Sequence, residues 1–225
     1  GPQQMPPATV VHNSLSRPDL LQIDAAQRVE ARRKLMVPES TRIFLNVARL
    51  ERGKGHEDLI RAMTQLSISD WELWLLGQGP EERSLKALAQ ELKLTDRVKF
   101  LGFCQDPTTH FAAANLFVSA SQLDSLPNAL IEAHAAGLPI VAYPSQGIPE
   151  IVDDPQTGRL CSEPTPAQLA KKIEEIIDSP ERCLVMGANA REKVQRDFDR
   201  EQQNQQFCRI ILERASPDSP EVNRT

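Results

Sequence analysis

The sequence predicts a doubly wound α/β domain, in which helices cover both faces of a parallel sheet. From residue 41 to residue 198, short apolar runs of strand length alternate with longer segments of helical periodicity. The runs are apolar at neighbouring positions, as in Ile43-Phe44-Leu45, so both faces of the strands are expected to be buried. The chain has 225 residues, which is enough for one such domain with extensions.

The expected strands are the apolar runs, and the expected helices lie between them. We place strands at 42–50, 71–77, 98–103, 115–120 and 138–143, with a weaker one at 158–162. A charged helix is expected at 24–36, before the first strand. Helical patterns then recur at 56–67, 80–93, 106–114, 127–136, 165–178, 181–197 and 200–214. Strands that alternate with helices in this way form a Rossmann-like sheet.

Composition excludes several classes of protein. No apolar run approaches the length of a membrane span, and the formal charge of −5 argues against nucleic acid as a partner. The four cysteines (Cys104, Cys161, Cys183 and Cys208) lie far apart without metal-type spacing. They are expected to be reduced, mostly buried thiols of a cytoplasmic protein.

Chemically distinctive residues follow the expected strands. In a parallel sheet the carboxyl ends of the strands share one edge, and ligands bind there. The strand ends lead into Arg49 with Gly53-Lys54-Gly55, Gly77-Gln78-Gly79-Pro80, Gly102-Phe103-Cys104, Ser119–Pro127 and Tyr143–Gly147. Topology alone therefore brings glycines, prolines, cations and a carboxylate to one edge.

Residues 121–139 are the most informative stretch, because a polar loop there leads into a helix. Pro127 suits the first helical position, since its missing N–H would have no partner there. The unpaired N–H groups of residues 126–129 then form an anion site, and phosphate is the usual anion. Asp124 and Glu132 flank this site and can accept hydrogen bonds from hydroxyl groups. Phosphate flanked by hydroxyls describes a nucleotide-diphosphate sugar.

This stretch resembles the donor-binding signature of glycosyltransferase family 4, whose members are retaining enzymes with the GT-B fold. The signature has two glutamates separated by seven residues, and here Asp124 replaces the first and Glu132 matches the second. Pro127, Asn128, Ala133, Gly137 and Pro139 also match, whereas Ser125, Leu126 and His134 replace Gly, Phe and Met. The resemblance covers roughly residues 41–198 and implies the C-terminal, donor-binding half of a GT-B enzyme.

The resemblance assigns catalytic roles to Arg49, Lys54 and Asp124. The segment from Ala48 to Gly55 is similar to a family motif whose Arg and Lys grip the two donor phosphates. Both cations would neutralise the charge that builds on the leaving diphosphate. By loop composition alone, they could also be solvated surface charges. Asp124 would hold the sugar ring, although its shorter side chain leaves the alternative of a residue that only marks the helix entry.

The same resemblance implies the donor-binding residues. Glu132 would accept both ribose hydroxyls, against the alternative of an exposed helix glutamate. Further contacts are expected at Gly77, Gly79, Cys104, Ser125, Leu126, Pro127 and Asn128. The two glycines would shape the pocket wall, and Cys104 would line it near the base. The residues around Pro127 would offer backbone N–H groups, although Asn128 could also be an ordinary first-turn residue.

The resemblance also divides the chain and names its partners. Residues 1–40 would hold a tail, an inter-domain linker and a helix, and 41–198 the donor-binding domain. The helix at 199–215 would pack towards an N-terminal domain absent from this chain, through Phe207, Ile210 and Ile211, before a flexible tail at 216–225. We expect a UDP- or GDP-linked sugar as donor and a saccharide or lipid-linked acceptor. No cofactor and no metal is expected, and membrane association would come through the missing half.

Three other functions share part of this pattern. A receiver domain has the same alternation but needs an acidic cluster after the first strand, where this chain has Arg49. A nucleotide-sugar epimerase or phosphorylase of the same fold would keep the phosphate site. A non-catalytic nucleotide-sugar-binding module is the third alternative.

Overall fold

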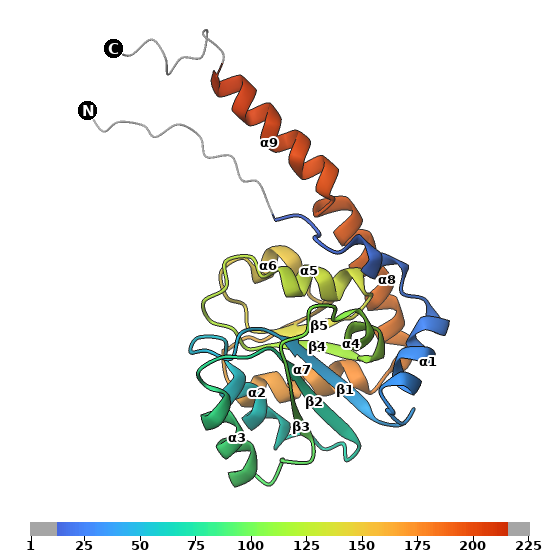
Figure 1. Cartoon of the computed structure of the whole chain (residues 1–225), viewed down its shortest axis with the longest axis vertical. Helices are drawn as coiled ribbons and strands as arrows, with labels where there is room; N and C mark the ends of the chain where they lie inside the picture. The colour runs from blue at the N-terminus through green and yellow to red at the C-terminus, as the bar shows by residue number, and fades with distance from the viewer. Residues whose placement is uncertain (1–12, 216–225) are drawn as a thin grey trace, which may run out of the picture.

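The computed structural model describes residues 13–215 and confirms the doubly wound α/β fold (Figure 1). Within that range, six parallel strands form one sheet in the order β3-β2-β1-β4-β5-β6. They are β1 (Arg42–Val47), β2 (Trp71–Leu76), β3 (Val98–Gly102), β4 (Leu116–Ser119), β5 (Ile140–Ala142) and β6 (Gly158–Leu160). Every strand lies inside a predicted run. The strand order reverses between β1 and β4, which is where open α/β sheets bind ligands.

Helices cover both faces of the sheet, as the two-sided apolar strands predict. One face carries α2 (His56–Met63), α3 (Glu82–Glu91) and α7 (Pro166–Ile177). The other carries α1 (Ala25–Lys34), α4 (Thr108–Ala113), α5 (Asn128–Ala135) and α8 (Pro180–Asp197). Neighbouring strand residues alternate between the two cores: Phe44 packs in the first, and Ile43 and Leu45 in the second.

Two short elements were not predicted. A 3-10 helix, η1, spans Pro18–Gln22, and α6 spans Ile148–Ile151. Each is too short to show a helical repeat in the sequence. The segment before α1 is tied to the domain, because Leu15 and Leu20 are buried in the core and the Leu15 N–H donates to the Phe198 carbonyl at 2.9 Å.

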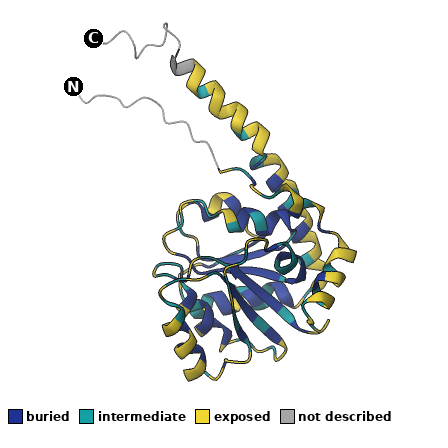
Figure 2. Ribbon diagram, viewed as in Figure 1, coloured by how far each residue is buried: buried dark blue, intermediate teal, exposed yellow. Residues whose placement is uncertain are grey.

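The last helix, α9 (Arg200–Ala215), extends away from the sheet and its helices (Figures 1 and 2). Phe207, Ile211 and Leu212 are exposed on it, and Ile210 is half-buried. Phe207 and Ile211, two of the three expected apolar residues, are therefore exposed, and the packing of this helix against another domain stays a prediction. The tail at 216–225, predicted to be flexible, and residues 1–12 lie outside the described residues.

The prediction that the cysteines are mostly buried is wrong. Of the four, all within the described range and all free thiols, Cys161 alone is fully buried. Cys104 and Cys183 are half-buried, and Cys208 is exposed because α9 extends away from the core. Among the helices of residues 13–215, none combines the length and the apolar character needed to cross a membrane.

His134 on α5 is expected to make the fold sensitive to acid. Its side chain is fully buried, and burial lowers its pKa to about 3. In the unfolded chain a histidine has a pKa near 6.5. Between that pH and about 3, the His134 side chain is therefore protonated in the unfolded state but not in the folded state. The free energy of unfolding is therefore unaffected by protonation of His134 above pH 6.5, and it falls as the pH drops from 6.5 towards 3. The loss is about 2 kcal/mol at pH 5.

Urea unfolding at pH 7 and pH 5 checks this prediction with His134→Met, which fills the buried site with a side chain that does not titrate. The variant should lose clearly less stability than the wild type between the two pH values. Some acid sensitivity should remain, because burial and then Lys54 lower the pKa of His56 to about 4. Equal losses in both proteins would show that His134 does not contribute.

Candidate functional site

The loop between β1 and α2 is bound to the loops that follow β2 and β4. The Leu50 N–H donates to the Gln78 carbonyl at 3.1 Å, and the Gln122 N–H donates to the Gly53 carbonyl at 2.9 Å. These bonds place the segment that carries Arg49 between its two neighbours at the carboxyl edge of the sheet. The predicted convergence of these strand ends is therefore present.

Gly77 and Gly79 let the loops after β1 and β2 approach closely. A Cβ on Gly77 would lie 2.0 Å from the Ala48 carbonyl oxygen, and one on Gly79 would lie 2.3 Å from that of Leu50. No side chain fits at either position without moving the backbone. Both glycines therefore allow the two loops to pack closely, and their role in the wall of a donor pocket stays a prediction.

Lys54 and Asp124, which follow different strands, form an ion pair. The Lys54 Nζ contacts the Asp124 Oδ1, and the two side chains are 22% and 17% exposed. The resemblance implies that the lysine contacts the donor phosphates and the aspartate the sugar, and it does not predict that the two side chains form an ion pair. The pair joins the loop after β1 to the loop after β4, on either side of the reversal in strand order.

Arg49 has a much looser environment than Lys54. Its side chain is 74% exposed, and its Nε lies 3.4 Å from the Glu51 carboxylate. Exposed pairs of this kind contribute little free energy, so Glu51 does not fix the guanidinium group. Arg49 can therefore turn towards a ligand at the edge.

The start of α5 differs from the prediction by one residue. Pro127 is not the first helical residue but the residue before it, with an extended backbone (φ −74°, ψ 120°), and Asn128 begins the helix. A proline φ fits the extended conformation as well as the helical one, and that accounts for the shift. Within the described residues, no side chain caps this helix start. Its backbone N–H groups therefore keep the orientation that favours an anion.

The segment before η1 contacts α5 in a way that the sequence reasoning missed. The Asn13 Nδ2 donates to the Leu126 carbonyl at 3.0 Å and to the Asn128 Oδ1 at 3.1 Å. The Ser16 hydroxyl donates to the Glu132 Oε1 at 2.8 Å. Glu132 is half-buried and already oriented by this bond. The only signal in the sequence is that these polar residues sit in the predicted linker.

The same segment also reaches the loop after β3. The Arg17 guanidinium lies 2.8 Å from the Asp106 carboxylate. The Thr108 hydroxyl, and then Arg17, hold the pKa of Asp106 well below its usual range. The half-buried Cys104 thiol donates to the Asp106 carbonyl at 3.2 Å. Residues 13–17 therefore run along the carboxyl edge and connect the surroundings of Glu132 with those of Cys104.

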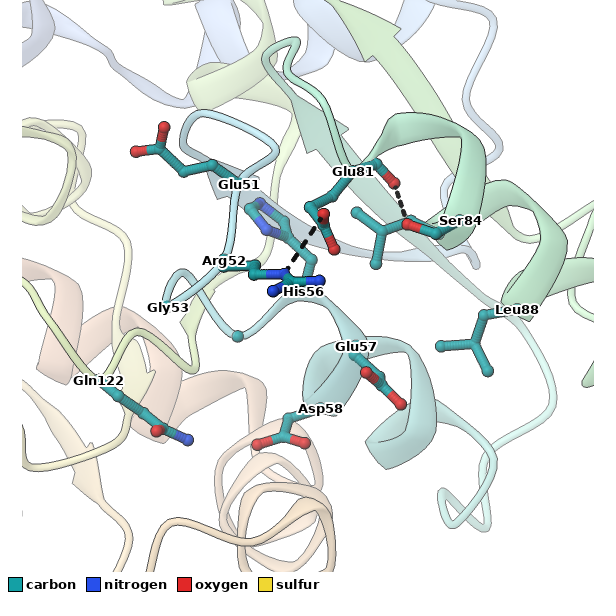
Figure 3. A pocket seen from close by; sticks show the side chains of 12 residues that line it. Glu51, Arg52, Gly53, His56, Glu57, Asp58, Glu81, Ser84, Leu88 and Gln122 are labelled. Atoms are coloured by element: carbon teal, nitrogen blue, oxygen red, sulfur yellow. Dashed lines mark hydrogen bonds and ion pairs between the residues drawn. The ribbon is translucent and has the colours of Figure 1, made fainter.

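A pocket of about 500 Å³ lies on the α2–α3 side of the β1–α2 loop (Figure 3). Four carboxylates line it, those of Glu51, Glu57, Asp58 and Glu81. Arg52, which is 93% exposed, lies 3.9 Å from Glu81. The predicted ligands Arg49, Lys54, Asp124 and Glu132 do not line this pocket. Its acidic lining would repel phosphate, so it is not the predicted anion site.

Residues 13–215 contain no group of three or more His, Cys, Asp and Glu side chains that could hold a metal ion. The expectation that the chemistry needs no metal ion stays a prediction.

Residues 27–193 match the family model described as glycosyl transferases group 1. The chain belongs to this family. An uncharacterized glycosyltransferase of Haemophilus influenzae is 33% identical over 151 residues, which are 66% of this chain and 43% of that protein. This group 1 chain spans about half the length, or less, of the curated relatives that it matches.

Solved structures show the same fold. The Anabaena protein Alr3699/HepE in complex with UDP and glucose superposes with a TM-score of 0.83 at 26% identity, over 91% of this chain and 56% of that one. The C-terminal domain of a Francisella tularensis glycosyl transferase group 1 protein (LpcC) superposes with a TM-score of 0.71 at 20% identity, over 81% of this chain and 98% of that domain. The predicted half of a GT-B fold is confirmed.

Proposed function

We infer that this group 1 chain is the donor-binding half of a retaining glycosyltransferase and binds a nucleotide-diphosphate sugar. The sugar would pass to a saccharide or lipid-linked acceptor held by the other half. The observation that carries this proposal is the contact between Lys54 and Asp124. It brings a cation and a carboxylate from two loops together at the reversal in strand order, beside an uncapped helix start.

Each side chain has a role that its surroundings support. The backbone N–H groups at the start of α5, with Lys54 and Arg49, would bind the two phosphates. Glu132, oriented by Ser16, would accept hydrogen bonds from the ribose hydroxyls. When the bond from the anomeric carbon to the phosphate oxygen breaks, negative charge grows on the leaving diphosphate. Lys54 and Arg49 would stabilise that charge without a metal.

The ion pair suggests how donor binding would alter the site. A bound diphosphate would compete with Asp124 for the Lys54 ammonium group. The Asp124 carboxylate would then share its hydrogen-bonding capacity between Lys54 and the sugar hydroxyls. The Asp124 carboxylate reaches Lys54 although its side chain is one methylene shorter than that of glutamate. A donor phosphate bound to Lys54 would therefore lie close to this carboxylate.

A calorimetric panel of UDP-, GDP- and ADP-glucose tests the donor site in this chain. We expect at least one of them to bind, with UDP-glucose first because a structural neighbour holds UDP and glucose. Glu132→Ala should weaken that binding roughly tenfold, since it removes hydrogen bonds to a charged acceptor. Arg33→Ala, at an exposed residue near the end of α1 that leads to the start of β1, should leave it unchanged. If none of the three nucleotides binds, the donor-site proposal is wrong.

The chain by itself is expected to transfer no sugar, because the acceptor half of the cleft is missing. Transfer by the purified chain would contradict this expectation. Conversion of the donor without any acceptor would instead favour an epimerase or a phosphorylase. In a polypeptide with both halves, full activity of an Asp124→Ala/Glu132→Ala variant would favour a non-catalytic binding module.

A further inference from the structure

Four arginines line one pocket at the edge where the strands begin, opposite the candidate donor site. Arg28 and Arg32 come from α1, Arg42 begins β1 and Arg191 comes from α8. The pocket has a volume of about 340 Å³. None of its lining residues takes part in the proposed donor site.

Three of these arginines bind backbone carbonyls at the ends of α4 and α5. Arg28 donates to the Ala112 carbonyl at 3.3 Å, and Arg32 donates to that of Ala113 at 2.8 Å. Arg191 donates to the Ala136 carbonyl at 3.1 Å. A helix C-terminus carries roughly half a negative charge, so two helix ends offset only about one of the three positive charges.

The remaining positive charge has no carboxylate in direct contact. Within the described residues, none of the four guanidinium groups forms a salt bridge. Glu39 and Asp70 act on Arg32 through space, and Asp70 also interacts in this way with Arg42. Burial, and then the neighbouring Arg191, lower the pKa of Arg28 to about 10. The cluster would therefore gain free energy from an added anion.

The side chain of Arg42 differs from those of the other three arginines. Its guanidinium group makes no hydrogen bond to any group in residues 13–212. The residue is half-buried at the start of β1, and all of its side-chain donors are available. A structural role in capping helices accounts for Arg28, Arg32 and Arg191, but it does not account for Arg42.

The rest of the pocket lining is largely apolar. It includes the alanines at 112–114, Leu138, Ile177 and the exposed Leu184 of α8. A Cβ on Gly187 would lie 2.3 Å from the Gly137 carbonyl oxygen, so α8 packs directly on the turn after α5. This close packing forms one wall of the pocket. A cavity of this size suits a small ligand, and charged and apolar lining together suit an amphipathic one.

We propose that this pocket binds a small amphipathic anion, a phosphate or carboxylate group on a short apolar body. Arg42 and the unused donors of Arg28 and Arg191 hold the charged group. The alanines and Leu184 contact the apolar body. The site is separate from the donor edge and does not depend on the proposed transferase activity.

Isothermal titration of the chain with n-octyl phosphate, inorganic phosphate and neutral octyl glucoside tests the proposal. We expect saturable binding of octyl phosphate, weaker binding of inorganic phosphate and none of octyl glucoside. Arg42→Ala should weaken octyl phosphate binding roughly tenfold, since it removes hydrogen bonds to a charged group. Arg33→Ala is the matched control, because Arg33 lies on α1 next to Arg32 but is exposed and paired with Glu30. Leu184→Ala should weaken the binding of octyl phosphate but not of inorganic phosphate.

Co-sedimentation with phosphatidate vesicles distinguishes a lipid head group from a soluble phosphate ester. The proposal stands for either source only if Arg42→Ala weakens the interaction. It is overturned if octyl phosphate does not bind, if Arg42→Ala and Arg33→Ala bind it equally, or if Lys54→Met abolishes binding, which would place the phosphate at the donor edge. Should Arg42→Ala fold poorly, Arg42→Gln keeps an aliphatic stem with an uncharged polar end and gives the same comparison.

Discussion

Replacing Lys54 by methionine is expected to weaken binding of the nucleotide-diphosphate sugar by roughly ten- to a hundredfold. The reason is the loss of a charge-assisted hydrogen bond to phosphate, which contributes about 1.5–3 kcal/mol. In a polypeptide with both halves, the transfer rate should fall further, by about a hundred- to a thousandfold. Lys54 would act most strongly on the charge that develops on the leaving diphosphate. Titration calorimetry measures the first effect, and initial transfer rates measure the second.

The ion pair with Asp124 provides a control that separates two roles of Lys54. The single variant leaves a carboxylate that is only 17% exposed without its partner, at a cost of about 1–3 kcal/mol in stability. In Lys54→Met/Asp124→Asn both charges are gone, so most of that stability should return. Donor binding should stay weak if Lys54 contacts phosphate. Recovery of both stability and binding would mean that the pair only holds the two loops together.

Gly147→Ala is expected to lower the melting temperature by roughly 10 °C, because it destabilises the fold by about 3 kcal/mol. The backbone at Gly147 is ordinary (φ −80°), so no conformational strain is involved. A Cβ there would lie 1.7 Å from the Ser125 carbonyl oxygen. The loop after β5 would have to move away from the loop that carries Asp124, and donor binding should weaken with it.

Gly102→Ala is the matched control for this steric effect. Gly102 has a φ of +71°, but a Cβ on it would have no other atom within 4 Å. Alanine there should cost only the left-handed strain, about 1 kcal/mol. Scanning calorimetry of both variants compares the effect of a steric clash on the melting temperature with the effect of backbone strain. Similar melting temperatures for the two would contradict the close approach of the loops at Gly147.

Much of the fold could be predicted because its pattern is local. The apolar runs from Ile43-Phe44-Leu45 onwards mark strands that are buried on both faces, and all six strands of the described range lie inside such runs. The short elements η1 and α6 were missed, since a helical repeat needs more than one turn to become visible. The exposure of Cys208 was missed, because the sequence does not say that α9 extends away from the core.

The candidate site was predicted as a set of residues at one edge, but not as a set of contacts. Strand topology places Arg49, Lys54, Gly77 and Asp124 together, because the carboxyl ends of parallel strands share that edge. Ser16 contacts Glu132 across 116 positions, and no periodic pattern carries that information.

The sequence by itself therefore determined the sheet, its two apolar faces and the edge to which the polar loops belong. The tertiary structure decided that Lys54 pairs with Asp124, that Ser16 orients Glu132 and that four arginines share a pocket. The physical reason is the separation along the sequence of the residues that determine each feature. Burial acts through the repeat of neighbouring residues, whereas a hydrogen bond depends on distances between loops that only the packed chain defines.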